Sequence, residues 1–154
     1  MQLSFNTLID NGEMQMQFWR YDIPHEITMD LINSLELDSD KEHVLSFSRF
    51  IDFDVKYHGT SIEYFLTNME LDRQVVSEDS DNFQVSYALK NPANIIKELD
   101  LDQMLFLCSV FHALNLKKYL VSVLSILMNT YNLKFDDIKQ KCKSESFKLN
   151  IFYK

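Results

Sequence analysis

The sequence predicts an α+β fold, with a small sheet in the first half of the chain and helices in the second. Three observations predict this class. Apolar and polar residues alternate on both sides of Asn11-Gly12, they alternate again over 83–89, and helical spacing continues from Pro92 to about residue 143. Strands followed by a run of helices are typical of the α+β class.

The first element that the pattern predicts is a β-hairpin. Leu3 and Phe5 alternate with polar residues before Asn11-Gly12, and the apolar residues of 14–18 alternate with glutamines after it. Asn-Gly between two alternating runs is a strong hairpin signal, because both residues tolerate the positive φ angles of a tight turn.

A short helix and a strand are expected next. Pro24 precedes a segment in which Ile27, Leu31 and Leu35 recur at helical spacing, so this segment is predicted to be an amphipathic helix. After the polar loop 38–43, the apolar run 44–47 is predicted to be a strand.

Residues 50–70 fit two patterns in succession. Phe53, Val55 and Tyr57 alternate, which favours a strand, and the apolar residues from Ile62 to Met69 then follow helical spacing. We therefore expect a strand followed by a helix that is capped by Thr60 or Ser61.

The rest of the chain is predicted to be mainly helical. The polar segment 76–82 is expected to be a solvent loop, and 83–89 is expected to be a strand. The final segment from residue 144 contains aromatic residues but shows little periodicity. Helices are predicted over 93–99, 102–113, 116–131 and 135–143.

Composition favours a folded, non-enzymatic protein. Apolar residues make up 46% of the 154 residues, and the net charge of −8 opposes binding to nucleic acid or anionic membrane. There are only two glycines, and no glycine-rich phosphate-binding motif occurs. The four histidines and the two cysteines, Cys108 and Cys142, lack metal-ligand spacing, so no metal, cofactor or catalytic residue is predicted.

The N-terminus lacks the basic and apolar regions of a signal peptide. The apolar stretch 119–128 is also too short to span a bilayer. A cytoplasmic or nuclear location is therefore expected.

The predicted helix 116–131 carries an unusually wide apolar face. Leu116, Leu120, Val123 and Leu127 lie on one side, and further apolar residues extend that side in both directions. The arc is roughly twice the 100° or so that an ordinary surface helix buries. This width predicts a partner-binding surface, and self-association when no partner is bound.

The order of these elements resembles the Skp-type adaptors of SCF ubiquitin ligases, which have a BTB/POZ fold. The segments that carry the resemblance are LIDNGEMQMQF (8–18), VLSFSR (44–49), LNLKKYL (114–120), VSVLSILMNTY (121–131) and KFDDIKQKC (134–142). The resemblance implies a BTB/POZ-like domain over 1–113, and a C-terminal helical extension over 114–154 that binds the partner. Residues FIDFDVKYHG are an insertion relative to that family.

The resemblance also implies partners. An F-box-like helical protein would bind the C-terminal helices, and a cullin would be a second partner. His112-Ala113 occupies the position of the family's cullin-facing Asn-Tyr pair. The residues expected to face the F-box-like partner are Leu120, Val123, Leu124, Leu127, Met128, Tyr131, Phe135, Ile138, Cys142 and Phe147.

Two other kinds of interaction protein fit the composition. One is a compact host-modulating protein such as a viral Bcl-like helical domain, although the Asn11-Gly12 hairpin argues against an all-helical fold. The other is an acidic DNA mimic, which would need carboxylates regularly spaced on one face. The acidic residues here gather mainly in predicted loops such as 38–40 and 78–81.

Overall fold

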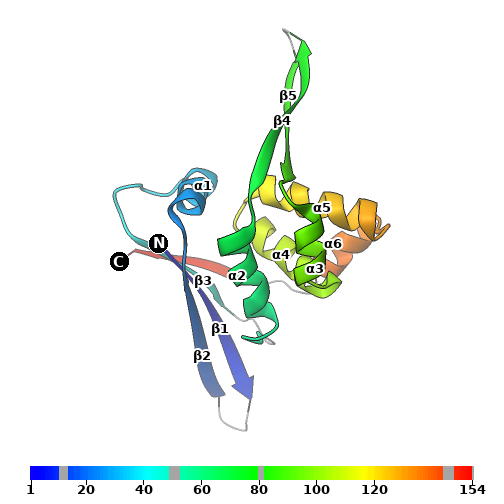
Figure 1. The fold of residues 1–154 in the computed structure, drawn as a ribbon. Helices are drawn as coiled ribbons and strands as arrows, with labels where there is room; N and C mark the ends of the chain where they lie inside the picture. The colour runs from blue at the N-terminus through cyan, green and yellow to red at the C-terminus, as the bar shows by residue number, and fades with distance from the viewer. Residues whose placement is uncertain (11–13, 49–52, 80–81, 144–147, 154) are drawn as a thin grey trace.

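A computed structural model describes residues 1–10, 14–48, 53–79, 82–143 and 148–153 (Figure 1). The described residues confirm the predicted α+β class. The strands are β1 (Gln2–Asp10), β2 (Met14–Asp22), β3 (His43–Ser48), β4 (Leu71–Asp79), β5 (Asn82–Leu89) and β6 (Lys148–Tyr153). The helices are α1 (His25–Leu35), α2 (His58–Asn68), α3 (Pro92–Glu98), α4 (Leu101–Ala113), α5 (Lys117–Thr130) and α6 (Phe135–Lys143).

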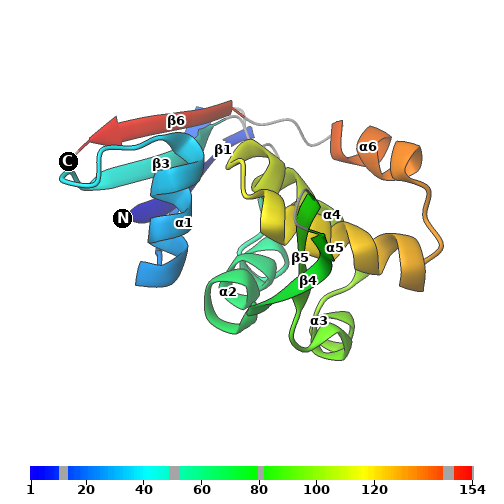
Figure 2. The same ribbon diagram turned by 90° about the horizontal axis from the view of Figure 1, so that it is seen from above.

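The main sheet has four strands in the order β2-β1-β3-β6. β1 pairs antiparallel with β2, which confirms the predicted hairpin, while the residues 11–13 that contain the predicted turn lie outside the described ranges. β3 runs parallel to β1 and confirms the strand predicted at 44–47. Leu3, Phe5, Leu45 and Phe47 are fully buried because helices α1, α2 and α4 lie on their side of the sheet (Figure 2).

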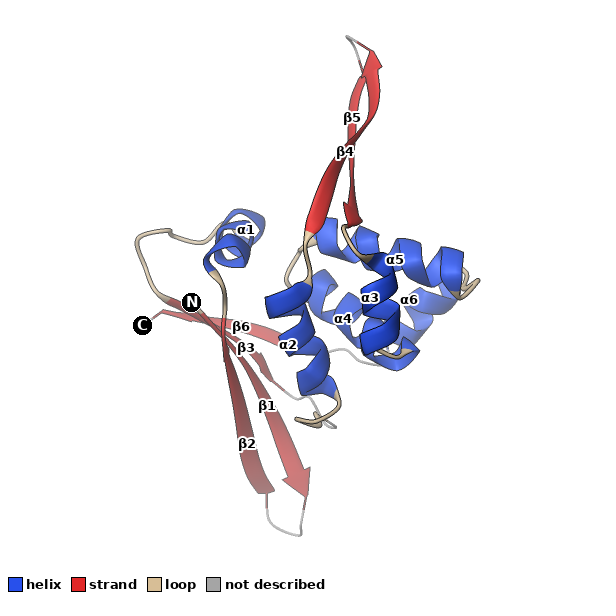
Figure 3. Cartoon of the chain, in the orientation of Figure 1, coloured by secondary structure: helices blue, strands red, loops and turns tan. Residues whose placement is uncertain are grey.

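A second, two-stranded sheet is formed by β4 and β5. This ribbon projects away from the helices, and only its base lies against α5 (Figure 3). The strand predicted at 83–89 is confirmed, but the expectation of a loop at 76–82 is wrong for 76–79 and Asn82. A register shift between Val75 and Ser77 interrupts the alternation there, so pairing with β5, rather than an apolar pattern, makes this segment a strand.

Helix α4 lies at the centre of the helical layer. Residues 103–111 are all buried, because α4 packs against α2, α5 and α6 on different sides. Asp100 caps the helix by accepting a hydrogen bond from the Gln103 backbone N–H at 2.8 Å, and the Gln103 side chain accepts from the Asp100 N–H at 3.0 Å. This reciprocal capping box fixes where the buried helix begins.

Two further segments differ from what the sequence indicated. Residues 53–57 form a turn rather than a strand, and α2 begins at His58, with Tyr57 instead of Thr60 or Ser61 at the cap position. Residues 148–153, where no regular element was expected, form β6, which pairs antiparallel with β3. In both segments contacts with distant residues decide the conformation.

Asparagine takes the place of glycine at two helix ends. Asn115, after α4, and Asn132, after α5, adopt left-handed conformations with φ of 55° and 53°. Asparagine tolerates this region better than most residues, which suits a chain with only two glycines. None of the described helices is both long enough and apolar enough to cross a lipid bilayer.

Candidate partner-binding surface

The wide apolar face of α5 is used mostly inside the protein. α5 packs against α4 and also against the base of the β4–β5 ribbon. Val123 and Leu127 are fully buried, and Tyr119 and Ile126 are nearly so. Because two neighbouring elements cover the helix, an arc wider than that of a one-sided surface helix is required.

The residues predicted to face a partner fall into four groups. Val123, Leu127 and Ile138 lie in the core. Leu120, Leu124, Tyr131 and Cys142 are half-buried and pack against the core. Met128 and Phe135 are exposed. Phe147 lies outside the described residues.

Exposed apolar side chains remain on α5 and at the start of α6. Val121 is 54% exposed, Met128 is 41% exposed, and Phe135, at the start of α6, is 51% exposed. We define the α5–α6 apolar surface as Val121, Leu124, Met128 and Phe135. Val121 is absent from the sequence-predicted partner residues. Its spacing of seven residues from Met128 is the signal that places both on one side of a helix.

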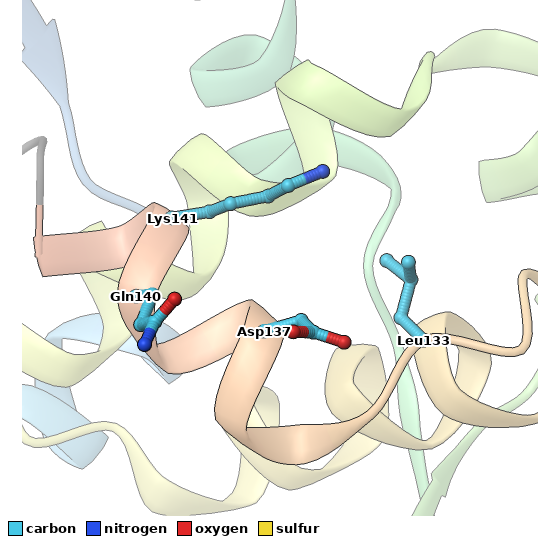
Figure 4. A pocket seen from close by; sticks show the side chains of 4 residues that line it. All are labelled: Leu133, Asp137, Gln140 and Lys141. Carbon is cyan, nitrogen blue, oxygen red and sulfur yellow. The ribbon is translucent and has the colours of Figure 1, made fainter.

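A hollow of about 440 Å³ lies beside α6 and is lined by Leu133, Asp137, Gln140 and Lys141 (Figure 4). The Asp137 carboxylate extends toward Leu133, whose side chain points upward in this view, and the long side chain of Lys141 extends above Asp137. The hollow therefore offers an apolar group next to groups of both charges. Such a surface suits contact with a protein side chain.

The start of α5 is held against α1. The Lys118 ammonium lies 3.4 Å from the Asp30 carboxylate. Burial raises the pKa of Tyr119 to about 12, and the negative charge of Asp30 and a hydrogen bond to it contribute further. The Tyr119 phenol is therefore protonated at neutral pH. These contacts fix the position of the helix that carries Val121 and Met128.

The described residues contain no group of three or more His, Cys, Asp or Glu side chains placed to hold a metal ion. Burial raises the pKa of the Cys108 thiol far above its usual range, with a smaller contribution from Cys142, which opposes a role as a thiolate nucleophile. His58 Nδ1 accepts a hydrogen bond from the Asp54 N–H at 3.0 Å, and its ring lies 4.8 Å from that of Phe106. His58 is thus part of the packing around α4.

The two residues at the position of the family's cullin-facing pair lie at the end of α4. His112 is exposed and Ala113 is half-buried. The His112 carbonyl accepts a hydrogen bond from the Asn115 N–H at 3.2 Å, within the turn that joins α4 to α5. In the sequence, residues 114–120 lie between this pair and Val121 of the α5–α6 apolar surface.

No protein-family model, curated protein or solved structure matches this chain. The fold and the exposed residues together describe an α+β protein with exposed apolar side chains on its C-terminal helices.

Proposed function

We propose that the protein is a non-enzymatic interaction adaptor that binds a helical segment of an F-box-like partner on the α5–α6 apolar surface. The observation that carries the proposal is the exposure of Val121, Met128 and Phe135 on consecutive helices. Apolar side chains grouped on a surface are typical of docking sites, and large residues with one exposed side often anchor a partner helix.

The order of elements supports a BTB/POZ-like fold of the Skp type. A hairpin, a helix and a third strand precede the helices, which is the order that the sequence resemblance implies. Two features depart from that order: the β4–β5 ribbon between α2 and α3, and the strand β6 after α6. The adaptor proposal therefore rests on the α5–α6 apolar surface more than on the fold.

The alternatives receive less support. The β1–β2 hairpin and the four-stranded sheet are inconsistent with an all-helical Bcl-like domain. A DNA mimic needs a continuous acidic face, but the outer side of α5 presents Val121 and Met128 beside Lys117 and Lys118.

The test is a binding titration of a purified F-box domain against the full chain and two glutamate variants. Met128→Glu places a charge on the α5–α6 apolar surface, whereas Met29→Glu places one on α1, where the methionine is 42% exposed compared with 41% for Met128. Loss of an interface anchor of about 2 kcal/mol weakens binding roughly 30-fold.

We expect Met128→Glu to weaken binding by about that factor and Met29→Glu to leave it unchanged, with both variants folded by circular dichroism. Equal binding by the two variants, or the absence of binding by the wild-type chain, would overturn the proposal.

A further inference from the structure

The second strand forms an open edge of the main sheet. β2 is the terminal strand in the order β2-β1-β3-β6, and it pairs with β1 over nine consecutive residue pairs, from Gln2 with Asp22 to Asp10 with Met14. The outer row of backbone N–H and C=O groups of a terminal strand has no partner strand within the sheet. Such an edge is a template for pairing with another chain.

This edge lacks the features that usually prevent edge-to-edge pairing. β2 contains no proline and no glycine, and its register with β1 shows no bulge. Its charged residues are limited to Arg20 and Asp22, both near one end. Natural edges are commonly short, bulged or rich in lysine, so nine regular residues with little charge are unusual for an edge that stays unpaired.

We propose that β2 pairs antiparallel with β2 of a second copy of this chain, about a two-fold axis through Phe18. This register pairs all nine residues of the strand with those of the second copy. It sets Phe18 opposite Phe18, Arg20 opposite Met16, and Asp22 opposite Met14. The two four-stranded sheets then join into one sheet of eight strands.

The length of the overlap favours this register, and charge opposes one alternative. A shift of the axis to Arg20 sets the two guanidinium groups directly opposite one another. A shift to Met16 pairs only residues 14–18 of the two strands, so Arg20 and Asp22 extend beyond the ladder. Like charges directly opposite each other destabilise a strand pair, so the register centred on Phe18 has both the longest overlap and no facing like charges.

The exposure of Phe18 supports its place on the axis. Phe18 is 50% exposed and pairs with Asn6, whereas its neighbour Trp19 turns inward and lies 4.8 Å from the ring of Phe53. Phe18 therefore lies on the side of the sheet away from the core. In the proposed dimer each Phe18 covers the other, which removes apolar surface from water.

A two-fold axis also explains why the pairing stops at two copies. Pairing of β2 with the other terminal strand, β6, would be head-to-tail and would build an open polymer. β6 has six residues compared with nine in β2, so the β2–β2 pair forms the longer ladder. The edge of β2 is separate from the α5–α6 apolar surface, so this inference stands or fails independently of the proposed function.

The test measures self-association of the full chain by sedimentation velocity over micromolar to millimolar concentration. We expect a reversible monomer–dimer equilibrium that strengthens with added salt, because two copies of net charge −8 repel one another. Phe18→Lys and Phe18→Glu each set like charges on the axis, so each variant alone should show at least a tenfold weaker dimer.

An equimolar mixture of the two variants should recover the dimer, because opposite charges then face each other. Phe152→Lys, a change at a residue 56% exposed on the other edge, is the matched control and should dimerise like the wild type. A monomeric wild type, a polymer, unchanged dimerisation of Phe18→Lys, or no recovery in the mixture would each overturn the proposal. Loss of the dimer in Met128→Glu would instead assign self-association to the α5–α6 apolar surface.

Discussion

Phe53 follows a strand-like alternation in the sequence but lies in a turn in the structure. It alternates with Val55 and Tyr57 as if in a strand, but its ring stacks on Phe5 at 4.7 Å and lies 4.8 Å from Trp19. Phe53 is 5% exposed, whereas Val55 is 46% exposed. The segment is a turn that inserts one aromatic ring into the core, and no ladder of hydrogen bonds accompanies the alternation.

Asp100 is the residue that joins the starts of α2 and α4. Its carboxylate accepts hydrogen bonds from the Gln103 N–H and, at 2.8 Å, from the Tyr57 hydroxyl. The Gln103 side chain in turn donates to the Tyr57 carbonyl at 2.6 Å. One carboxylate thus accepts a hydrogen bond from a free N–H group at the start of α4 and also fixes the turn that precedes α2.

We predict that Asp100→Ala lowers the free energy of unfolding by about 1–2 kcal/mol, the usual cost of losing a helix cap. Asp100→Asn should lose less, because an amide oxygen can still accept from the Gln103 N–H. Urea denaturation followed by circular dichroism measures both values. Asp102→Ala, an exposed change two residues later, is the control and should cost about 0.5 kcal/mol or less. A cost for Asp100→Ala no larger than that of the control would show that the cap does not stabilise α4.

At the scale of elements, β6 makes the C-terminal segment part of the main sheet. This strand pairs with β3 from His43 with Tyr153 to Ser48 with Lys148, so the end of the chain returns to the sheet in which the chain begins. Leu149 and Ile151 pack against the core, whereas the neighbouring Phe152 is exposed. The C-terminal region therefore contributes to the sheet as well as to the helical layer.

We predict that Ile151→Ala lowers the free energy of unfolding by about 1–2 kcal/mol, because it removes half-buried apolar surface from the sheet. Phe152→Ala, the neighbouring exposed residue, should change it by about 0.5 kcal/mol or less. Thermal or urea unfolding of the two variants makes the comparison. A larger loss for Phe152→Ala would show that β6 presents its other side to the core.

At the scale of the whole molecule, α4 connects the sheet to the C-terminal helices. Phe106 on this helix lies 6.2 Å from the rings of both Phe5 and Phe53, and Phe111 packs against Phe65 and Tyr119 at 4.8 and 5.6 Å. The buried apolar residues form one cluster that extends from β1 to α6. A single connected core favours cooperative unfolding.

We predict that the sheet and the C-terminal helices unfold in one transition. Trp19, the only tryptophan, reports on the sheet through its fluorescence, and circular dichroism at 222 nm reports mainly on the helices. The two signals should give coincident urea unfolding curves. Separate midpoints would show that regions 1–113 and 114–154 unfold as independent units.

The sequence by itself determined the elements that a local pattern of apolar and polar residues marks. The β1–β2 hairpin, α1 and the four C-terminal helices were all predicted, because alternation around Asn11-Gly12 or helical spacing of apolar residues marks each of them in the sequence. The resemblance to Skp-type adaptors and the F-box-like partner remain predictions.

Tertiary structure alone decided which apolar residues are exposed and which weakly patterned segments become strands. Val123 and Met128 both belong to the wide apolar face that the sequence predicts for α5, yet contacts with α4 and the β4–β5 ribbon bury the first and leave the second at the surface. β6 and the end of β4 are strands because a partner strand completes their hydrogen bonds. Both outcomes depend on contacts between residues that are distant in the chain. A local sequence pattern holds no information about such contacts.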